Sequence, residues 1–310
     1  MAGLESLITS GYIITAITLY LAYWLITTLY SITKDYFILW QIATGGYANN
    51  AGSPKLRLHA YVCSTSRLDK HSVREISCFL RSMVDFRYTD EELHSILLKY
   101  DHVVFCREKR DGSMRGMLLM KVERHQKENG GMYTLMRLGS GFMQAGYQGG
   151  PLLYYVLSCR LLKELILHPY TPLYIIGKTF GYKSYLAFAT TVKNFYPRYN
   201  TTTPSFEKRL LDNYAESMRF SGESYNQEGV IEREGVMLKE NVSPISNEDL
   251  NNPHIQFFQE HNPGWHKGHQ LCILAKVTWG DVIRGLSRKT LMRHLNAFLE
   301  SDQNHTGNIA

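Results

Sequence analysis

The segment QAGYQGGPLLYYVLSCRLLKEL, residues Gln144–Leu165, runs from a glycine-rich turn into an apolar helix. The predicted fold and function both depend on this segment. Three glycines fall within its first seven residues. Apolar residues then follow a helical period, which predicts a helix over 152–167 that ends at His168-Pro169. The turn either only redirects the chain or frees backbone N–H groups to hold a phosphate at the helix N-terminus.

Patterning predicts regular elements on both sides of this turn. Before it we expect a helix from Thr89, which forms a capping box with Glu92, and a β-hairpin at Asp111-Gly112. The other expected elements are strands over 56–65, 132–143, 172–180 and 269–277, and helices over 68–86, 182–195 and 287–299. The stretch 201–252 is polar, so we expect a long excursion with at most one strand.

Composition limits the class of protein. The chain has 310 residues, a net charge of +6 and 44% apolar residues, which is typical of a folded protein. Lys and Arg are scattered without a basic arm, so we expect no nucleic-acid partner. The five cysteines are widely spaced and lie mostly in apolar runs, which predicts buried free thiols in a reducing compartment.

The N-terminal segment 6–33 contains no charged residue and is long enough to cross a bilayer. We therefore predict a membrane anchor over 1–43, a linker over 44–55 and a folded domain over 56–310. The positive-inside rule places that domain in the cytosol, as part of a single-pass membrane protein in contact with the lipid bilayer through 6–33. The alternative is a buried hairpin or core helix, because threonines and tyrosines dilute the hydrophobicity.

The order of elements resembles the GCN5-related N-acetyltransferase (GNAT) superfamily, in which a glycine-containing turn after the fourth strand leads to a helix under the pyrophosphate of acetyl-CoA. The resemblance implies an α/β fold with a mixed, mostly antiparallel central sheet flanked by helices. It also implies acetyl-CoA or another acyl-CoA as co-substrate. The implied cofactor-binding residues are Gln144, Gly146, Gln148, Gly149 and Gly150. Only Gly149 keeps the family's spacing of glycines from the glutamine.

The resemblance also implies a tyrosine acid on the helix after the fifth strand. Tyr185 is the first candidate and Tyr182 the second. A carboxylate base on the fourth strand is missing, and Glu123 on the preceding strand is the nearest option; a solvated charge beside Arg124 is the other interpretation. The expected function is a membrane-anchored, acyl-CoA-dependent N-acyltransferase with an unidentified amine acceptor. The alternatives are an inactive GNAT-like binding or scaffold protein at a membrane, and an enzyme acting on a lipid-like substrate.

Three histidines, His261, His266 and His269, lie within nine residues. Their spacing fits no standard zinc motif, and neither a Cys nor a pair of carboxylates lies nearby. We therefore expect no metal site here, and interpret the stretch as a loop that packs against or lines a pocket.

Overall fold

A computed structural model describes residues 58–85, 88–148, 152–218, 224–226, 229–232, 237, 239 and 244–285. The chain divides into two compact units, residues 1–50 and 51–310, and every described residue belongs to the second. The predicted membrane anchor, the predicted linker 44–55 and the predicted helix over 287–299 all lie outside the described residues.

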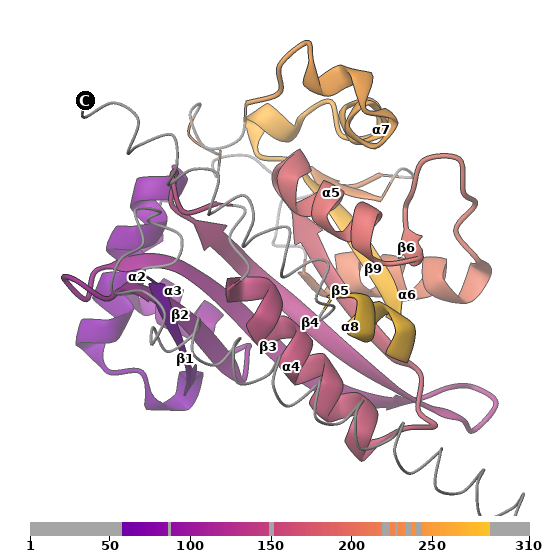
Figure 1. The fold of residues 1–310 in the computed structure, drawn as a ribbon, viewed down its shortest axis with the longest axis horizontal. Helices are drawn as coiled ribbons and strands as arrows, with labels where there is room; N and C mark the ends of the chain where they lie inside the picture. The colour runs from indigo at the N-terminus through magenta and orange to yellow at the C-terminus, as the bar shows by residue number, and fades with distance from the viewer. Residues whose placement is uncertain are drawn as a thin grey trace, which may run out of the picture. The chain divides into compact units, whose positions relative to one another are not determined.

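The described strands form one mixed sheet in the order β1-β2-β3-β4-β5-β9-β8-β7, and β6 pairs with β9 beside this path (Figure 1). Each pairing among them is antiparallel except that of β4 with β5, which is parallel. The strand bounds are Leu58–Ser64 (β1), His102–Glu108 (β2), Met114–Gln126 (β3), Met132–Met143 (β4), Leu173–Thr179 (β5), Asn194–Tyr196 (β6), Ser224–Tyr225 (β7), Val230–Glu232 (β8) and Gln270–Val277 (β9). The predicted mixed, mostly antiparallel sheet is confirmed.

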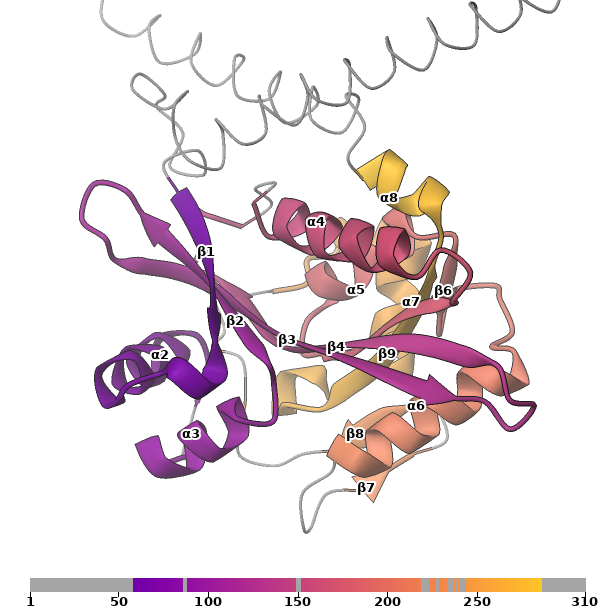
Figure 2. The same cartoon turned by 90° about the horizontal axis from the view of Figure 1, so that it is seen from below.

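Helices cover both faces of this sheet. Figure 2 shows α4, α5 and α8 on one face and α2, α3 and α6 on the other. The helix bounds are Lys70–Met83 (α2), Asp90–Leu97 (α3), Leu152–Leu167 (α4), Tyr182–Thr191 (α5), Ser205–Met218 (α6), Pro253–His261 (α7) and Trp279–Gly285 (α8). Short 3-10 turns occupy Thr65–Arg67 (η3), Asp249–Asn251 (η4) and Trp265–Lys267 (η5). One layer of helices therefore covers each face of the sheet.

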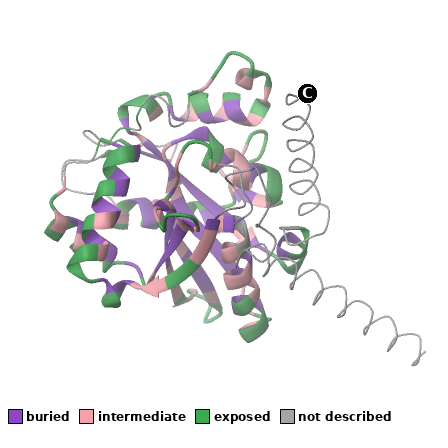
Figure 3. Cartoon of the chain, turned by 60° about the vertical axis from the view of Figure 1, so that its left-hand side comes forward, coloured by how far each residue is buried: buried purple, intermediate pink, exposed green. Residues whose placement is uncertain are grey.

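The core forms where apolar helix faces meet the sheet, and buried residues accordingly concentrate on the strands (Figure 3). One cluster joins α2 and α3 to β2, β3 and the end of β4, with Ile76, Leu97 and Met117 wholly buried. A second joins α6 to β4, β5 and β9. Full burial of a large apolar side chain contributes roughly 1.5–3 kcal/mol, so these clusters fix α2, α3 and α6 against one face of the sheet.

Most elements before α5 have the predicted positions. The capping box of α3 forms, since the Glu92 backbone N–H donates to the Thr89 hydroxyl and the Glu92 carboxylate accepts from the Thr89 backbone N–H. The predicted strand over 132–143 and the predicted helix over 152–167 match β4 and α4.

The polar stretch 201–252 departs from the prediction. Instead of an excursion with at most one strand, it contains the helix α6 and the strands β7 and β8. The buried residues of α6 include Leu210, Leu211, Tyr214 and Ala215. Their spacing places them on one helix face, so a few apolar residues anchor a segment whose average composition is polar.

The predicted membrane location is wrong. In the part of the chain that the structure describes, no helix is long and apolar enough to cross a membrane. The most apolar long helix, α4, has 16 residues and carries Arg160, Lys163 and Glu164. Such a helix is about 24 Å long, which is short of the hydrocarbon core. Segment 6–33, on which the prediction rested, lies outside the described residues.

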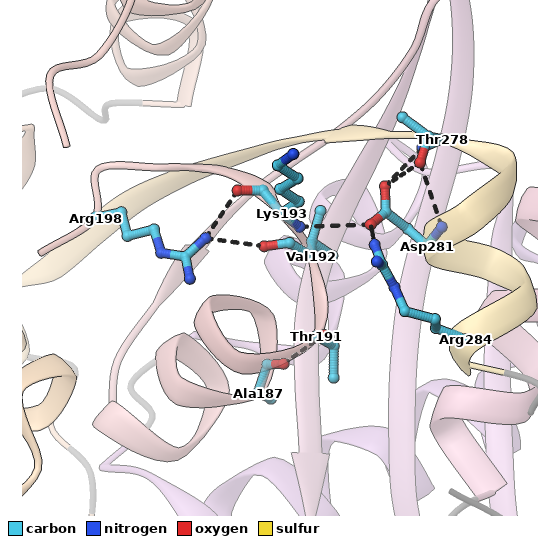
Figure 4. A network of polar contacts seen from close by, with 8 residues as sticks. All are labelled: Ala187, Thr191, Val192, Lys193, Arg198, Thr278, Asp281 and Arg284. Carbon is cyan, nitrogen blue, oxygen red and sulfur yellow. Dashed lines mark hydrogen bonds and ion pairs between the residues drawn. The ribbon is translucent and has the colours of Figure 1, made fainter. Parts of the chain in front are cut away.

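A polar network holds α8 against the connection between α5 and β6 (Figure 4). Thr278 and Asp281 form the start of α8 through reciprocal side-chain to backbone hydrogen bonds. The other Asp281 oxygen accepts from the Lys193 backbone N–H at 3.4 Å and pairs with Arg284 at 2.5 Å. The Arg198 guanidinium donates to the backbone carbonyls of Val192 and Lys193. These contacts tie the last described helix to the sheet.

Candidate active site

The two parallel strands β4 and β5 separate at their carboxyl ends. Their last paired residues are Arg137 and Ile176, although β4 continues to Met143 and β5 to Thr179. Backbone of Gly177 still lies against β4, since a Cβ there would be 3.2 Å from the Leu138 carbonyl oxygen. Beyond this point the β4 edge that faces β5 has no strand partner, so its N–H and C=O groups are available to a ligand.

A β-bulge in β4 lies at this divergence. On β3, Leu118 pairs with Gly141 and Met120 pairs with Leu138, so Leu119 faces both Gly139 and Ser140. A bulge leaves a residue out of the ladder and bends the strand. Gly139 is required here because a Cβ would lie 2.6 Å from the ring of Tyr100. The bulge therefore presents unpaired backbone at the point where the two strands part.

The glycine-rich turn follows directly after β4. The Tyr147 backbone N–H donates to the Gln144 carbonyl at 3.0 Å, and Gly146 adopts a φ of +84°. A glycine with positive φ at the third position is typical of a type II turn. The Gln148 carboxamide donates back to the Met143 carbonyl at 3.2 Å. Gly149 and Gly150, two of the predicted cofactor-binding residues, lie outside the described residues.

Two cations contact the side chains of this turn. Arg115 of β3 donates to the Gln144 side-chain oxygen at 2.9 Å, and Lys183 of α5 donates to the Gln148 side-chain oxygen at 3.0 Å. Arg115 also pairs with the buried Glu108, which accepts from the Tyr147 hydroxyl. A turn flanked by cations and followed by a helix N-terminus attracts anionic groups such as phosphates.

A pocket opens on the opposite face of the sheet, between α2, α3 and α6. It has a volume of about 870 Å³ including space open to solvent. Its floor is formed by Ser140 of the bulge, Lys178 at the end of β5 and Gln270 of β9. The remaining described lining residues are Leu80, Val84, Tyr88, Leu93, Ile96, Leu97, Lys99, Tyr100, Leu119, Phe142, Phe180, Ser217 and Met218. The divergence of β4 and β5 thus lies between the glycine-rich turn and this pocket.

The predicted acid candidates lie on α5, outside the described pocket lining. Tyr185 is wholly buried, with ring centroids 5.3 Å from Phe195 and 5.6 Å from Phe258. Tyr182 lies at the start of α5, next to Lys183. Burial, followed by the nearby Asp249 carboxylate, raises the pKa of Tyr182, and burial raises the pKa of Tyr185. Both phenols therefore keep their protons at neutral pH.

The predicted base, Glu123, lies in an ion-pair cluster on β3. Its carboxylate contacts Arg137 at 2.5 Å and Lys121 at 3.0 Å. Glu123 is not among the described residues that line the pocket. None of those lining residues is a carboxylate or an imidazole.

The histidine-rich loop holds its side chains in separate contacts. The His261 ring stacks on Phe257, and the His269 carbonyl accepts from the Asn262 side chain. No group of three or more His, Cys, Asp or Glu side chains that could hold a metal occurs among the described residues. All five cysteines are free; Cys106 and Cys272 are buried as predicted, whereas Cys78 is exposed.

Comparison with known proteins gives a structural similarity only. No protein-family model and no curated protein match the sequence. Among solved structures, the glucosamine-6-phosphate N-acetyltransferase of Arabidopsis thaliana is 14% identical and has a TM-score of 0.28, with 37% of this chain and 80% of that chain covered. A GNAT-family acetyltransferase of Streptococcus pneumoniae is 11% identical with a TM-score of 0.30, covering 47% of this chain and 92% of that one.

The NatC complex bound to Gag peptide and CoA is 11% identical with a TM-score of 0.32, covering 71% of this chain and 99% of the matched one. These similarities to acetyltransferases are distant, and the α/β fold is defined by its own mixed sheet and flanking helices. What the site does has to follow from its own geometry.

Sequence reasoning missed four side chains of this region: Arg115, Lys183, Lys178 and Gln270. Lys183 follows Tyr182 directly and could have been noticed as a cation at a helix start. Arg115 reaches the turn only through the register of β3 with β4. Lys178 and Gln270 meet in the pocket because β5 and β9 are neighbours in the sheet, which no local pattern indicates.

Proposed function

We propose that the chain is an N-acyltransferase that moves an acyl group from an acyl-CoA thioester to an amine. The observation that carries this proposal is the divergence of β4 and β5 between an anion-attracting turn on one side and a pocket on the other. In open α/β sheets, ligands bind beyond the carboxyl ends of the strands, where neighbouring connections separate.

The phosphates of CoA would bind at the turn of Gln144–Gln148, between Arg115 and Lys183, beside the N-terminus of α4. The pantetheine arm would then follow the unpaired edge of β4 through hydrogen bonds to its backbone. This places the thioester at the bulge of Gly139 and Ser140. Backbone N–H groups there would polarise the thioester carbonyl.

The amine would approach the carbonyl carbon from the pocket. Its nitrogen forms a bond to that carbon as the bond from carbon to sulfur breaks, and the CoA thiolate leaves. We propose Tyr182 as the acid that protonates this thiolate, because it lies beside Lys183, which contacts the turn. Tyr185 is the alternative acid. The amine's proton would leave to water. Lys99 and Lys178 favour the neutral, nucleophilic amine, since like charges disfavour its ammonium form.

Titration of the full chain with CoA tests the proposal. Saturation at about a hundred times the dissociation constant would add roughly 2.7 kcal/mol to the free energy of unfolding, seen as a rise in Tm. Lys183→Met should weaken CoA binding about tenfold but leave the binding of pantetheine, which has no phosphate, unchanged. Lys163→Met, an exposed lysine on α4, is the matched control.

Failure of millimolar CoA and acyl-CoA to raise Tm would contradict the acyltransferase proposal. The alternative of a GNAT-like binding protein predicts CoA binding without acyl transfer to any amine, and no observation on the described residues favours it.

A further inference from the structure

Gln270 is a buried polar side chain whose hydrogen-bonding atoms are unused. The residue is 0% exposed, and neither its Oε1 nor its Nε2 has a hydrogen-bond partner in the part of the chain that the structure describes. Burying amide atoms without partners costs free energy, and such groups are rare in folded proteins. A ligand that completes these hydrogen bonds would account for the side chain.

Gln270 lies on the pocket side of the sheet, near the end where β4 and β5 part. It is the first residue of β9 and precedes Leu271, which forms the last pair of β9 with β5 opposite Thr179. Side chains alternate along a strand, so Gln270 shares a face with Cys272 and Leu274, which belong to the core cluster with α6. The Gln270 side chain lines the pocket. A ligand that reaches it therefore occupies the space through which the amine would approach.

Apolar and aromatic side chains form most of the pocket wall. Among them, Phe142 and Phe180 have ring centroids 6.0 Å apart. The two lysines of the lining, Lys99 and Lys178, have interactions within the protein, so neither lysine indicates an anionic ligand. The pocket therefore suits an apolar body that carries one uncharged polar group to Gln270.

The carboxamide of Gln270 limits the geometry of the group that can pair with it. Its Nε2 would donate to a carbonyl oxygen, and its Oε1 would accept from an N–H on a neighbouring atom. Primary carboxamides and lactams carry an N–H and a C=O on the same side, so they form two parallel hydrogen bonds with Gln270. A trans peptide bond holds its C=O and N–H on opposite sides and satisfies only one of the two atoms. We therefore expect the ligand to present a primary carboxamide or a lactam.

We infer that the acceptor is an apolar amine that carries a primary carboxamide or a lactam. Its amide would pair with Gln270, its apolar body would pack against the pocket wall, and its amine would face the divergence of β4 and β5. The inference rests on the proposed acyl transfer. The amine nitrogen bonds to the acyl carbon, the carbon–sulfur bond breaks, and the amine's proton leaves to water while the thiolate is protonated. The products are the CoA thiol and an N-acyl amine whose own amide is unchanged.

An acceptor panel assayed with the full chain tests this inference, with release of the CoA thiol as the readout. The better of para-(aminomethyl)benzamide and α-amino-ε-caprolactam should be used at least tenfold better, in kcat/KM, than para-methylbenzylamine, which lacks the amide. The same advantage should hold over para-(aminomethyl)-N,N-dimethylbenzamide, which has no amide N–H. Comparison of the benzamide with the caprolactam shows whether the amide is a primary carboxamide or a lactam. Equal use of para-methylbenzylamine, or a preference for para-(aminomethyl)benzoate or a peptide that begins with leucine, would overturn the inference.

Ligands without a reactive amine test the role of Gln270 apart from catalysis. Benzamide or caprolactam should raise the Tm of the full chain, whereas N,N-dimethylbenzamide should not. Gln270→Met and Gln270→Leu should abolish this rise, and both should have a higher Tm than wild type without ligand, because they replace unpaired buried polar atoms by apolar ones. Gln259→Leu, at an exposed position of α7 outside the described lining, should change neither value. A lower Tm in both Gln270 variants would identify a structural role and overturn the inference.

Binding of CoA separates this inference from the proposed function. Gln270→Met should keep the rise in Tm that CoA causes, which also shows that the variant folds. If wild-type protein acylates amines but gains nothing from an amide on the acceptor, the acceptor class is wrong and acyl transfer stands. If benzamide or caprolactam binds but CoA does not, the acyltransferase proposal fails while the amide site at Gln270 stands.

Discussion

Asp281 is a single side chain on which several structural contacts converge. One oxygen accepts from the Thr278 backbone and hydroxyl, and the other accepts from the Lys193 backbone N–H and from Arg284. Burial alone would raise the pKa of this carboxyl, but the hydrogen bonds from Thr278 and Arg284 outweigh it and hold the pKa below its usual value. The folded state thus stabilises the ionised form of the Asp281 carboxyl.

We expect Asp281→Asn to lower the free energy of unfolding by about 1–2 kcal/mol at pH 7, the range for a lost cap and charged hydrogen bonds. Because the folded-state pKa is depressed, the stability from Asp281 is present above its usual pKa of about 4 and is lost as pH falls below that value. Urea unfolding of both proteins between pH 7 and pH 3 checks this. The difference in unfolding free energy between wild type and Asp281→Asn should shrink toward acid pH. The control Glu248→Gln, at an exposed site, should change the free energy of unfolding by less than about 0.5 kcal/mol.

Substitutions at Gly146 test how much the backbone conformation of the turn matters. A Cβ at this position meets no atom within 4 Å, so only the φ of +84° opposes a side chain. Gly146→Ala should destabilise the protein by about 1 kcal/mol and weaken CoA binding about tenfold, because the strained turn shifts its N–H groups. Asn tolerates this conformation better than Ala, so Gly146→Asn should keep most of the stability and most of the CoA affinity of wild type. Equal losses in the two variants, measured by urea unfolding and CoA titration, would argue against a conformational cause.

At the scale of elements, the bulge of β4 depends on Gly139. A methyl group there would lie 2.6 Å from the Tyr100 ring and 2.8 Å from the Leu119 Cβ. Gly139→Ala should lower the free energy of unfolding by about 1–3 kcal/mol, the usual effect of overpacking a core. It should also reduce the rate of acyl transfer more than the affinity for CoA. Gly131→Ala, in the hairpin between β3 and β4, should cost less than about 0.5 kcal/mol. Denaturant unfolding and thiol-release assays measure the two effects.

Elements with strong local signals could be predicted from the sequence. On α2, the apolar residues that recur at helical spacing in the sequence form the buried face: Val73, Ile76, Phe79, Leu80 and Met83. Helix α6 was missed because a polar average composition hid the apolar spacing from Leu210 to Ala215. Helical period would have been the better guide there, since burial depends on where apolar residues lie and not on their average number.

Register explains why Arg115 could not be placed from the sequence. The hairpin after β3 pairs Gln126 with Met132, and counting outward from that pair puts Met114 opposite Gln144. The bulge at Gly139 and Ser140 shifts the register by one residue, so Gly116 instead pairs with Met143 and Arg115 meets Gln144. Sequence reasoning could locate the glycine-rich turn but could not supply the bulge, which depends on contacts of Gly139 with Tyr100, between α3 and β2, and with Leu119 of β3.

For the whole molecule, the two layers of helices separate the two proposed substrates. CoA would bind on the face of α4 and α5, and the acceptor would enter between α2, α3 and α6 on the other face. The divergence of β4 and β5 lies between these two proposed sites and would connect them. Neither ligand needs to leave before the other binds, so the geometry favours direct transfer within a ternary complex.

A covalent route would need a nucleophile at the divergence. Ser140 is the one hydroxyl of the bulge that lines the pocket, and no cysteine is among the described lining residues. No described His, Asp or Glu lies in that lining to activate this serine, so we expect it to stay unmodified. Initial rates measured over both substrates should give intersecting double-reciprocal lines, and Ser140→Ala should retain at least a third of kcat. Parallel lines, together with an acylated enzyme seen by mass spectrometry in wild type and absent from Ser140→Ala, would replace direct transfer with a two-step mechanism through Ser140.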